Sequence, residues 1–290
     1  MKLTVPHIGN LDIMLGAIGR LVGPEFVFPP KTSPRTLSLG IKHSPTSTCL
    51  PFKFILGNFI EALERGADTI AMVSDHGPCR VGMYDVVMQQ ILRDLGFKFT
   101  WISMDDTRLW SHYVQRFNKE RKEWGASFWK TIQALLLGWR KLRLCEKVER
   151  LAHRVRPLEI ERGETTRVEN RCLRLIDEAE NLRQLQKAWE ESVHLFNRIE
   201  RDPTRKPIKV VITGEGYMVV NPHANQEIER RLGEMGVEVT RTVWITHKIG
   251  HALGLDFFHP RSKWRAIKAS KPYLRYNLGG ECNSSIGYPI

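Results

Sequence analysis

Hydrophobic and polar positions alternate regularly through the first third of the chain. Short apolar runs are separated by stretches in which apolar residues recur at helical spacing. The runs predict strands at residues 3–5, 25–28, 69–73 and 98–102, with a further candidate at 37–41. The two clearest helices are predicted at 51–65 and 81–95, each followed by a glycine. Strands that alternate with helices of this length predict βαβ units and a mainly parallel sheet.

The pattern changes at residue 106, where the strand signals stop. Long charged stretches then carry apolar residues at helical spacing, and Pro157 and Gly163 break them into at least two helical parts. From Pro207 the alternation resumes, with a strand predicted at 209–213, a helix from Asn221-Pro222 to about Met235, and a strand at 237–245.

These patterns predict an α/β fold with two Rossmann-like parallel-sheet lobes and a helical insertion. The expected divisions are an N-terminal α/β lobe, a charged helical insertion and a C-terminal α/β lobe, at residues 1–105, 106–206 and 207–290. Chains of 290 residues commonly form two domains of ordinary size.

Composition and charge narrow the class of protein. Hydrophobic residues make up 42% and charged residues 26%, which excludes wholesale disorder. No apolar run approaches the roughly 20 residues that span a bilayer, so we expect a cytoplasmic protein without a membrane partner. The net charge of +12 is distributed as +1, +6 and +5 over residues 1–105, 106–205 and 206–290. A basic surface attracts nucleic acid, phosphate-rich ligands or acidic proteins, and the charge alone does not choose among them.

Cys49 and Cys79 are the most informative residues. Each is predicted to follow a strand and to lie at the start of a helix, and 30 residues separate them. In a parallel sheet this places both at the carboxyl edge, where ligands usually bind. A helix N-terminus stabilises the thiolate that ligates metals. The alternative is two small buried hydrophobic side chains, and two cysteines alone do not complete a zinc or iron–sulfur site.

Four stretches of sequence resemble one family. They are PHIGN at 6–10, GIKHSPTSTCLPFKFILGNF at 40–59, DTIAMVSDHGPCRVGMY at 68–84 and TGEGYMVVNPHANQEIERRLGEMG at 213–236. Together they resemble the acyl-CoA dehydratase activase-related proteins, which are relatives of the 2-hydroxyacyl-CoA dehydratase subunits and of the double-cubane-cluster reductases. The pattern C-x-P-x-K begins at Cys49 and C-x4-Y begins at Cys79. The resemblance covers most of residues 1–105 and 207–290 and is weak across the insertion.

The resemblance implies an oxygen-sensitive iron–sulfur cluster, of the [4Fe-4S] type, held between the α/β lobes with Cys49 and Cys79 as ligands. It also implies a partner, an ATP-hydrolysing activase of the actin/Hsp70-like superfamily that injects low-potential electrons. In the dehydratases such an electron reduces a 2-hydroxyacyl-CoA to a ketyl radical. A dehydratase-like partner subunit or a homodimer would complete the assembly, and whether the chain is itself an enzyme component stays open.

The sequence departs from the family pattern near its end. Residues 279–287 read GGECNSSIG where the family has GGHGxxSIG, and the sequence reaches Ile290 before the segment in which relatives carry a Cys-Met-Pro-Glu motif. The C-terminal lobe is therefore expected to be incomplete, or a partner supplies the rest. Cys282 is our own candidate for a third metal ligand and is not a family position. His76, near Cys79, either tunes the cluster or moves protons, or it is a solvent-facing loop residue. Cys145 and Cys172 are expected to be packing residues.

Other patterns suggest other classes of protein. THKIGHALGLDFFH resembles a metzincin zinc site, with His247 and His251 four apart, but Lys248 replaces the general-base glutamate. Surface or packing histidines explain it better. Gly214-Glu215-Gly216 is a tight turn rather than a phosphate loop. Aromatic and basic residues interleave between Trp124 and Arg143 and could bind nucleic acid, a partner or a neighbouring helix. A cluster-free scaffold that binds a partner through these basic helices, and a nucleic-acid-binding protein, are the alternatives.

Overall fold

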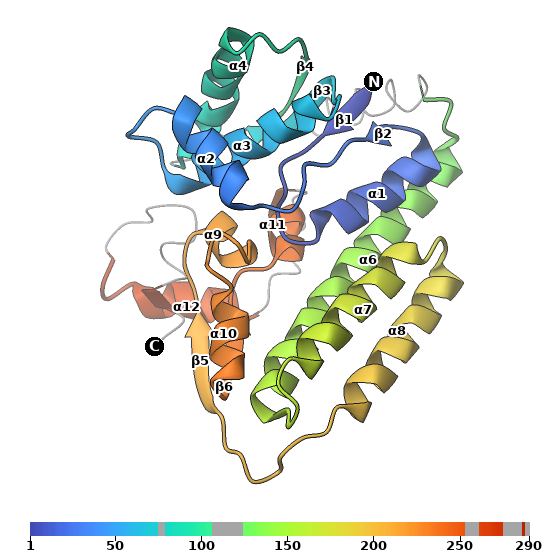
Figure 1. Ribbon diagram of the computed structural model, residues 1–290, viewed down its shortest axis with the longest axis vertical. Helices are drawn as coiled ribbons and strands as arrows, with labels where there is room; N and C mark the ends of the chain where they lie inside the picture. The colour runs from blue at the N-terminus through green and yellow to red at the C-terminus, as the bar shows by residue number, and fades with distance from the viewer. Residues whose placement is uncertain (75–78, 106–123, 253–260, 275–285, 288–290) are drawn as a thin grey trace. The chain divides into compact units, whose positions relative to one another are not determined.

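The computed structural model describes residues 1–74, 79–105, 124–252, 261–274 and 286–287 (Figure 1). The chain divides into two compact units. One contains Met1–Ile8, Ile18–Ala134 and Lys271–Asn283, and the other contains Gly9–Ala17, Leu135–Ser270 and Ser284–Ile290. The domain boundaries predicted at residues 105 and 206 stay a prediction.

The first unit is built on a four-stranded parallel sheet. Its strands are β1 (Lys2–Thr4), β2 (Glu25–Phe26), β3 (Thr69–Ser74) and β4 (Thr100–Asp105), in the order β2-β1-β3-β4. Leu3 pairs with Phe26 on one side and with Thr69 on the other, so β1 is an interior strand. Ile70, Ala71 and Met72 of β3 are buried, as expected of an interior strand of a parallel sheet. The predicted parallel sheet is confirmed here.

Among the residues described, six helices belong wholly or partly to this unit. They are α1 (Leu11–Val22), α2 (Pro34–His43), α3 (Leu50–Glu64), the 3-10 helix η1 (Arg80–Met83), α4 (Tyr84–Asp94) and, as far as Ala134, α6 (Phe128–Val155). The helix predicted at 51–65 is confirmed as α3, which is buried along most of its length. The helix predicted at 81–95 is confirmed as η1 and α4 together.

The strand predicted at 37–41 is wrong, because these residues lie in helix α2. Ser33 caps this helix in a reciprocal capping box with Thr36, and Pro34 occupies its first turn. Helices α2 and α3 lie side by side (Figure 1) and approach closely at two glycines. A Cβ atom on Gly40 would lie 1.7 Å from the Lys53 carbonyl oxygen, and one on Gly57 would lie 1.9 Å from that of Thr36.

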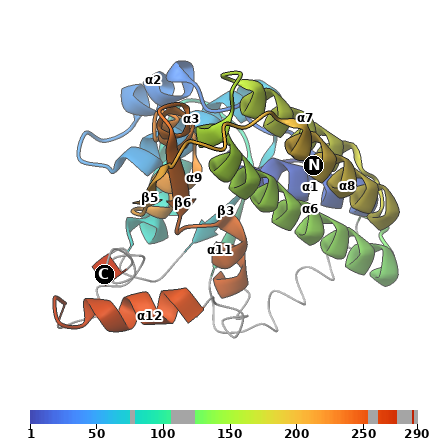
Figure 2. The same cartoon turned by 90° about the horizontal axis from the view of Figure 1, so that it is seen from below.

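The second unit contains a layer of three long helices (Figures 1 and 2). They are α6 (Phe128–Val155), α7 (Glu164–Glu178) and α8 (Leu182–Arg198), with the 3-10 helix η2 (Arg156–Leu158) after α6. The breaks predicted at Pro157 and Gly163 are confirmed, and Gly163 has a φ of 87°, which favours glycine. Buried residues such as Val148, Ile176 and Phe196 form the core between these helices.

Among the residues described, the remainder of the second unit contains two parallel strands and four short helices. The strands are β5 (Ile208–Ile212) and β6 (Val237–Arg241). The helices are α9 (Gly216–Val220), α10 (Ile228–Glu234), α11 (Ile245–Ala252) and α12 (Arg261–Ser270). The α/β class is therefore confirmed with two parallel sheets, the second of which has two strands among the residues described. Rossmann-like topology in both lobes stays a prediction.

Two predicted elements of this part are corrected. The helix predicted from Asn221 begins instead at Ile228, because Gln226 and Glu227 have positive φ angles of 59° and 56° that a continuous helix excludes. Asn221 ends α9 rather than starting a helix. The strand predicted at 237–245 ends at Arg241, and α11 begins at Ile245.

Candidate functional site

Cys49 lies at the N-terminus of α3. Its backbone is extended, with φ −68° and ψ 158°, and its side chain does not cap the helix. Pro51 in the first turn favours a helix start here. Just before it, the Thr48 N–H and hydroxyl both donate to the Pro45 carbonyl and form a turn. The prediction that Cys49 lies at the start of a helix is confirmed, but the residues before it form α2 and this turn rather than a strand.

Cys79 lies at the start of η1, after β3 and the residues 75–78 that fall outside the description. Its backbone is extended, with φ −76° and ψ 140°, and its side chain is exposed. The Gly82 N–H donates to the Cys79 carbonyl in the first turn of η1. Both cysteines therefore begin helical segments with the same local backbone geometry.

Tyr84, the first residue of α4, connects the two cysteine-bearing segments. Its Oη atom lies 2.7 Å from Cys49 Sγ, a hydrogen-bond distance at which either group can donate. Its ring packs edge-on against Phe52 of α3 with the centroids 5.0 Å apart, and the side chain is buried. Tyr84 thus fixes the start of α4 against the start of α3.

Arg80 makes a second connection between the same segments. Its Nη1 atom donates to the Ser47 carbonyl at 3.2 Å, two residues before Cys49. Lys53 Nζ donates to the Thr46 carbonyl in the same turn at 3.4 Å. The structure therefore brings together residues 45–53 and 79–84, and these segments carry the two predicted ligands together with cationic side chains.

The four described cysteines fall into two classes. Cys49 is half-buried and Cys79 exposed, whereas Cys145 and Cys172 are completely buried in the core of the second unit. Burial raises the pKa of the Cys145 thiol well above its ordinary value of 9.0, and burial also raises that of Cys172. Raised values keep both thiols protonated, and this agrees with the prediction that they are packing residues.

Several predicted site residues lie outside the description. Cys282 and His76 are among them, as are the last residues of the zinc-like motif, and for His251 only the backbone is described. Within the described part of the chain, no group of three or more His, Cys, Asp or Glu side chains is placed to hold a metal ion. Cys49 and Cys79 as metal ligands therefore stay a prediction, as does Cys282.

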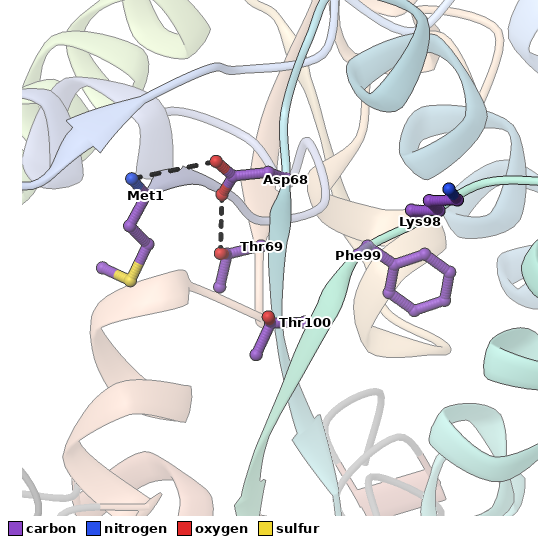
Figure 3. Close-up of a pocket in the computed structure, with 6 residues that line it drawn as sticks. All are labelled: Met1, Asp68, Thr69, Lys98, Phe99 and Thr100. Atoms are coloured by element: carbon purple, nitrogen blue, oxygen red, sulfur yellow. Dashed lines mark hydrogen bonds and ion pairs between the residues drawn. The ribbon is translucent and has the colours of Figure 1, made fainter.

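A surface pocket lies at the amino-terminal ends of β3 and β4 in the four-stranded sheet (Figure 3). Its lining consists of Met1, Asp68, Thr69, Lys98, Phe99 and Thr100. The Lys2 backbone N–H holds the pKa of the Asp68 carboxyl below its ordinary value, and the N-terminal amine lies 3.7 Å from the same carboxylate. Because ligands of parallel sheets bind at the carboxyl ends of strands, this pocket is the weaker candidate.

The turn at Gly214-Glu215-Gly216 does not present its N–H groups to a ligand. The Glu215 carboxylate accepts hydrogen bonds from the backbone N–H groups of Tyr217 and Met218 at 3.1 and 2.9 Å. Those groups at the start of α9 are the ones that would bind a phosphate. The Glu215 carboxylate thus occupies the N–H groups that a phosphate would need, which agrees with the expectation that this segment is not a phosphate loop.

A buried ionic cluster lies in the second unit, centred on Arg241. This guanidinium forms ion pairs with Glu149 and with Glu229, and His153 lies 3.5 Å from the Glu229 carboxylate. Burial alone would raise the pKa of Glu229, but Arg241 and His153 together hold it below its ordinary value. Asn10 also donates to Glu149 at 2.6 Å. These contacts join α6, α10 and β6, so the cluster is a structural element of this unit.

Trp244 completes that cluster. Its ring lies between two guanidinium groups, with Arg150 4.1 Å and Arg241 4.0 Å from the ring centroid. Its indole N–H donates to the Arg241 carbonyl at 2.9 Å. This cation–π stacking fixes the start of α11 and leaves the indole buried, away from any external ligand.

The fold defines an α/β protein with a parallel sheet. Its segments 45–53 and 79–84 lie together, and each carries a cysteine at the start of a helix. The sequence matches the family described as the CoA enzyme activase uncharacterised domain over residues 18–243. The chain therefore belongs to this family, and the match includes the helical segment across which the family resemblance was weak. No curated protein matches the chain. Among the described helices, none has both the length and the apolar character needed to cross a membrane.

Proposed function

We propose that this protein binds an iron–sulfur cluster of the [4Fe-4S] type through Cys49 and Cys79 and transfers low-potential electrons in a system driven by an ATP-hydrolysing activase. One observation carries the proposal, namely that the Tyr84 and Arg80 contacts bring the two cysteine-bearing segments together. Membership of a CoA enzyme activase domain family supports the connection to an activase.

The donor set fits part of such a cofactor. Iron–sulfur clusters are held by cysteine thiolates, and Cys49 and Cys79 both lie at the starts of helical segments. Cys79 is accessible to an incoming metal. Two thiolates supply half of a four-cysteine set, so further ligands would come from Cys282 or from a partner chain. When bound, the cluster would supply one-electron chemistry, and this chain would hold and orient it.

The experiment is the iron and acid-labile sulfide content of the full chain purified without oxygen, together with its electronic spectrum. The same assay is run on Cys49→Ala, Cys79→Ala and Cys282→Ala, with the buried Cys172→Ala as the matched control. We expect iron and sulfide in the parent and in the control, and loss of both in Cys49→Ala and Cys79→Ala. No iron after attempted reconstitution of the folded parent would overturn cluster binding by this chain alone and leave a partner-dependent site or a cluster-free scaffold.

The coupling to an activase is tested separately on cluster-loaded protein. Reduction of the cluster is followed spectroscopically with ATP and a purified activase, and with the chemical reductant dithionite as the control. We expect ATP-dependent reduction by the activase. If dithionite reduces the cluster and the activase does not, cluster binding still stands, but the proposal that an activase donates the electrons is wrong.

A further inference from the structure

The first three turns of α6 expose a group of large apolar side chains. Phe128 is 55% exposed, Trp129 72%, Leu135 41% and Leu136 48%. These four residues lie within nine consecutive positions, whereas other exposed apolar side chains of the described chain are more scattered. Singly exposed apolar residues are ordinary, but an exposed cluster on one element marks an interaction surface.

The spacing of these residues is that of a helix-packing surface. Phe128, Ile132, Leu135 and Trp139 follow one another at intervals of four, three and four, and Trp129 and Leu136 flank this line. Such intervals place apolar side chains along one stripe of a helix, as in the interface between two packed helices. A different face of α6 carries Ala134, Leu137 and Val148, which are buried within the protein. Leu142, the next position of the line, is also buried, so the exposed stripe ends at Trp139. The helix therefore has one apolar face in the core and a second one outside it.

The charges of α6 determine which partner suits this exposed stripe. Residues 128–155 contain seven Lys or Arg and two Glu. Both glutamates are already engaged, because Glu146 accepts hydrogen bonds from Thr246, and Glu149 pairs with Arg241. Lys130, Arg140 and Arg143 are exposed beside the apolar stripe. The outer surface of α6 is therefore apolar and basic, with no acidic group of this helix to neutralise it.

We propose that the exposed face of α6 docks an amphipathic helix from an acidic protein partner, with apolar residues along its centre and Asp or Glu at its margins. Opposite charges at the margins of a helix pair set partner choice and orientation. A second copy of this chain would place basic α6 margins against each other, and like charges oppose that pairing. Heptad-like spacing favours a helix over a lipid surface. This inference does not depend on the cluster.

The test uses the full chain and a fluorescently labelled 21-residue peptide with Leu at the two core positions of each heptad and Glu at the flanking positions. Glutamates at the flanking positions of every heptad oppose the pairing of two such peptides. We expect saturable binding in fluorescence anisotropy. Trp129→Glu and Leu136→Glu are each expected to weaken binding at least about tenfold, as substitutions of central interface residues do. The matched control is Met235→Glu, which changes a 77% exposed apolar residue elsewhere and should bind like the parent. Circular dichroism checks that each variant is folded.

A charge exchange makes the test specific. The variant Arg140→Glu/Arg143→Glu should bind the Glu peptide more weakly and should bind better to the same peptide with Lys in place of each Glu. Equal affinity of the parent for the Glu and Lys peptides would overturn the proposal. So would binding to phosphatidylserine vesicles in place of the peptide, or a concentration-dependent dimer in sedimentation that Trp129→Glu abolishes, since these outcomes assign the face to a membrane or to a second copy.

Discussion

The phenol oxygen of Tyr84 lies 2.7 Å from the sulfur of Cys49, although 35 residues separate them in the sequence. Cys49 begins α3 and Tyr84 begins α4, so this contact ties together the first turns of two helices. The Tyr84 side chain is buried and its ring packs against Phe52, which leaves the hydroxyl group little freedom to turn away. The position of the Cys49 sulfur is therefore determined by a residue of the segment that carries Cys79.

Tyr84→Phe isolates this hydrogen bond, because it removes the hydroxyl group and keeps the ring. We expect the free energy of unfolding to fall by about 0.5–1.5 kcal/mol, the usual net contribution of one hydrogen bond. Urea unfolding followed by circular dichroism measures the change. Tyr273→Phe, at an exposed tyrosine, is the control and should leave stability unchanged. In a double-mutant cycle with Cys49→Ala, a coupling energy near zero would show that the two groups do not interact.

The close approach of α2 and α3 predicts a large effect of small substitutions. The Cβ of Gly40→Ala or Gly57→Ala would meet a backbone carbonyl oxygen at 1.7 or 1.9 Å, and a backbone atom cannot move aside as a side chain can. We expect each variant to lose about 3 kcal/mol of stability, the upper range for overpacking. Gly250→Ala is the control, because nothing lies within 4 Å of its Cβ. It should be neutral or more stable by up to about 1 kcal/mol. Equal behaviour of all three variants would contradict this close approach of α2 and α3.

The elements that were predictable from the sequence are those with strong local signals. The apolar run that begins at Thr69 predicted β3 nearly at its observed bounds. The helical pattern that stops at Gly66 did the same for α3. Residues 37–41 resemble a strand in the sequence because they form a short, largely apolar run. The capping box at Ser33 and Thr36, with Pro34 between them, was the local signal for a helix. The break at Gln226 and Glu227 had no such signal, because neither residue type favours a positive φ.

The candidate site was also predictable only in part, because local sequence signals place helix starts but do not specify contacts between distant segments. The positions of Cys49 and Cys79 at helix starts follow from neighbouring residues, so sequence reasoning reached them. The contact of Cys49 with Tyr84 depends on how α3 packs against α4, and the pair of Arg241 with Glu149 joins residues 92 apart. Such pairs are selected by tertiary packing, and a single sequence carries no direct signal of them.

Thiol accessibility predicts an order of chemical modification. Cys79 is exposed and Cys49 is half-buried beneath Tyr84, whereas Cys145 and Cys172 are buried with raised pKa values. With iodoacetamide under native conditions, we expect Cys79 to react first, Cys49 more slowly, and the two core cysteines only after unfolding. Peptide mass spectrometry over a time course resolves each site. Native-state labelling of Cys145 or Cys172 at the rate of Cys79 would show that the core of the second unit is not packed as described.

The ionic cluster around Arg241 predicts a specific loss of stability in acid. The pKa of Glu229 lies below its ordinary value of 4.5 because Arg241 and His153 outweigh the effect of burial. Its charge therefore stabilises the native state above that ordinary value, and the contribution disappears as the pH falls through the lowered native pKa. Glu229→Gln should lose about 3 kcal/mol at neutral pH, since it breaks a buried ion pair, and should approach the parent as the pH falls below the lowered native pKa of Glu229. Urea unfolding over this range measures the difference. Glu234→Gln, which breaks a more exposed pair with Arg230, should lose less than about 1 kcal/mol. A constant difference between Glu229→Gln and the parent at every pH would mean that Glu229 acts through packing rather than through its charge.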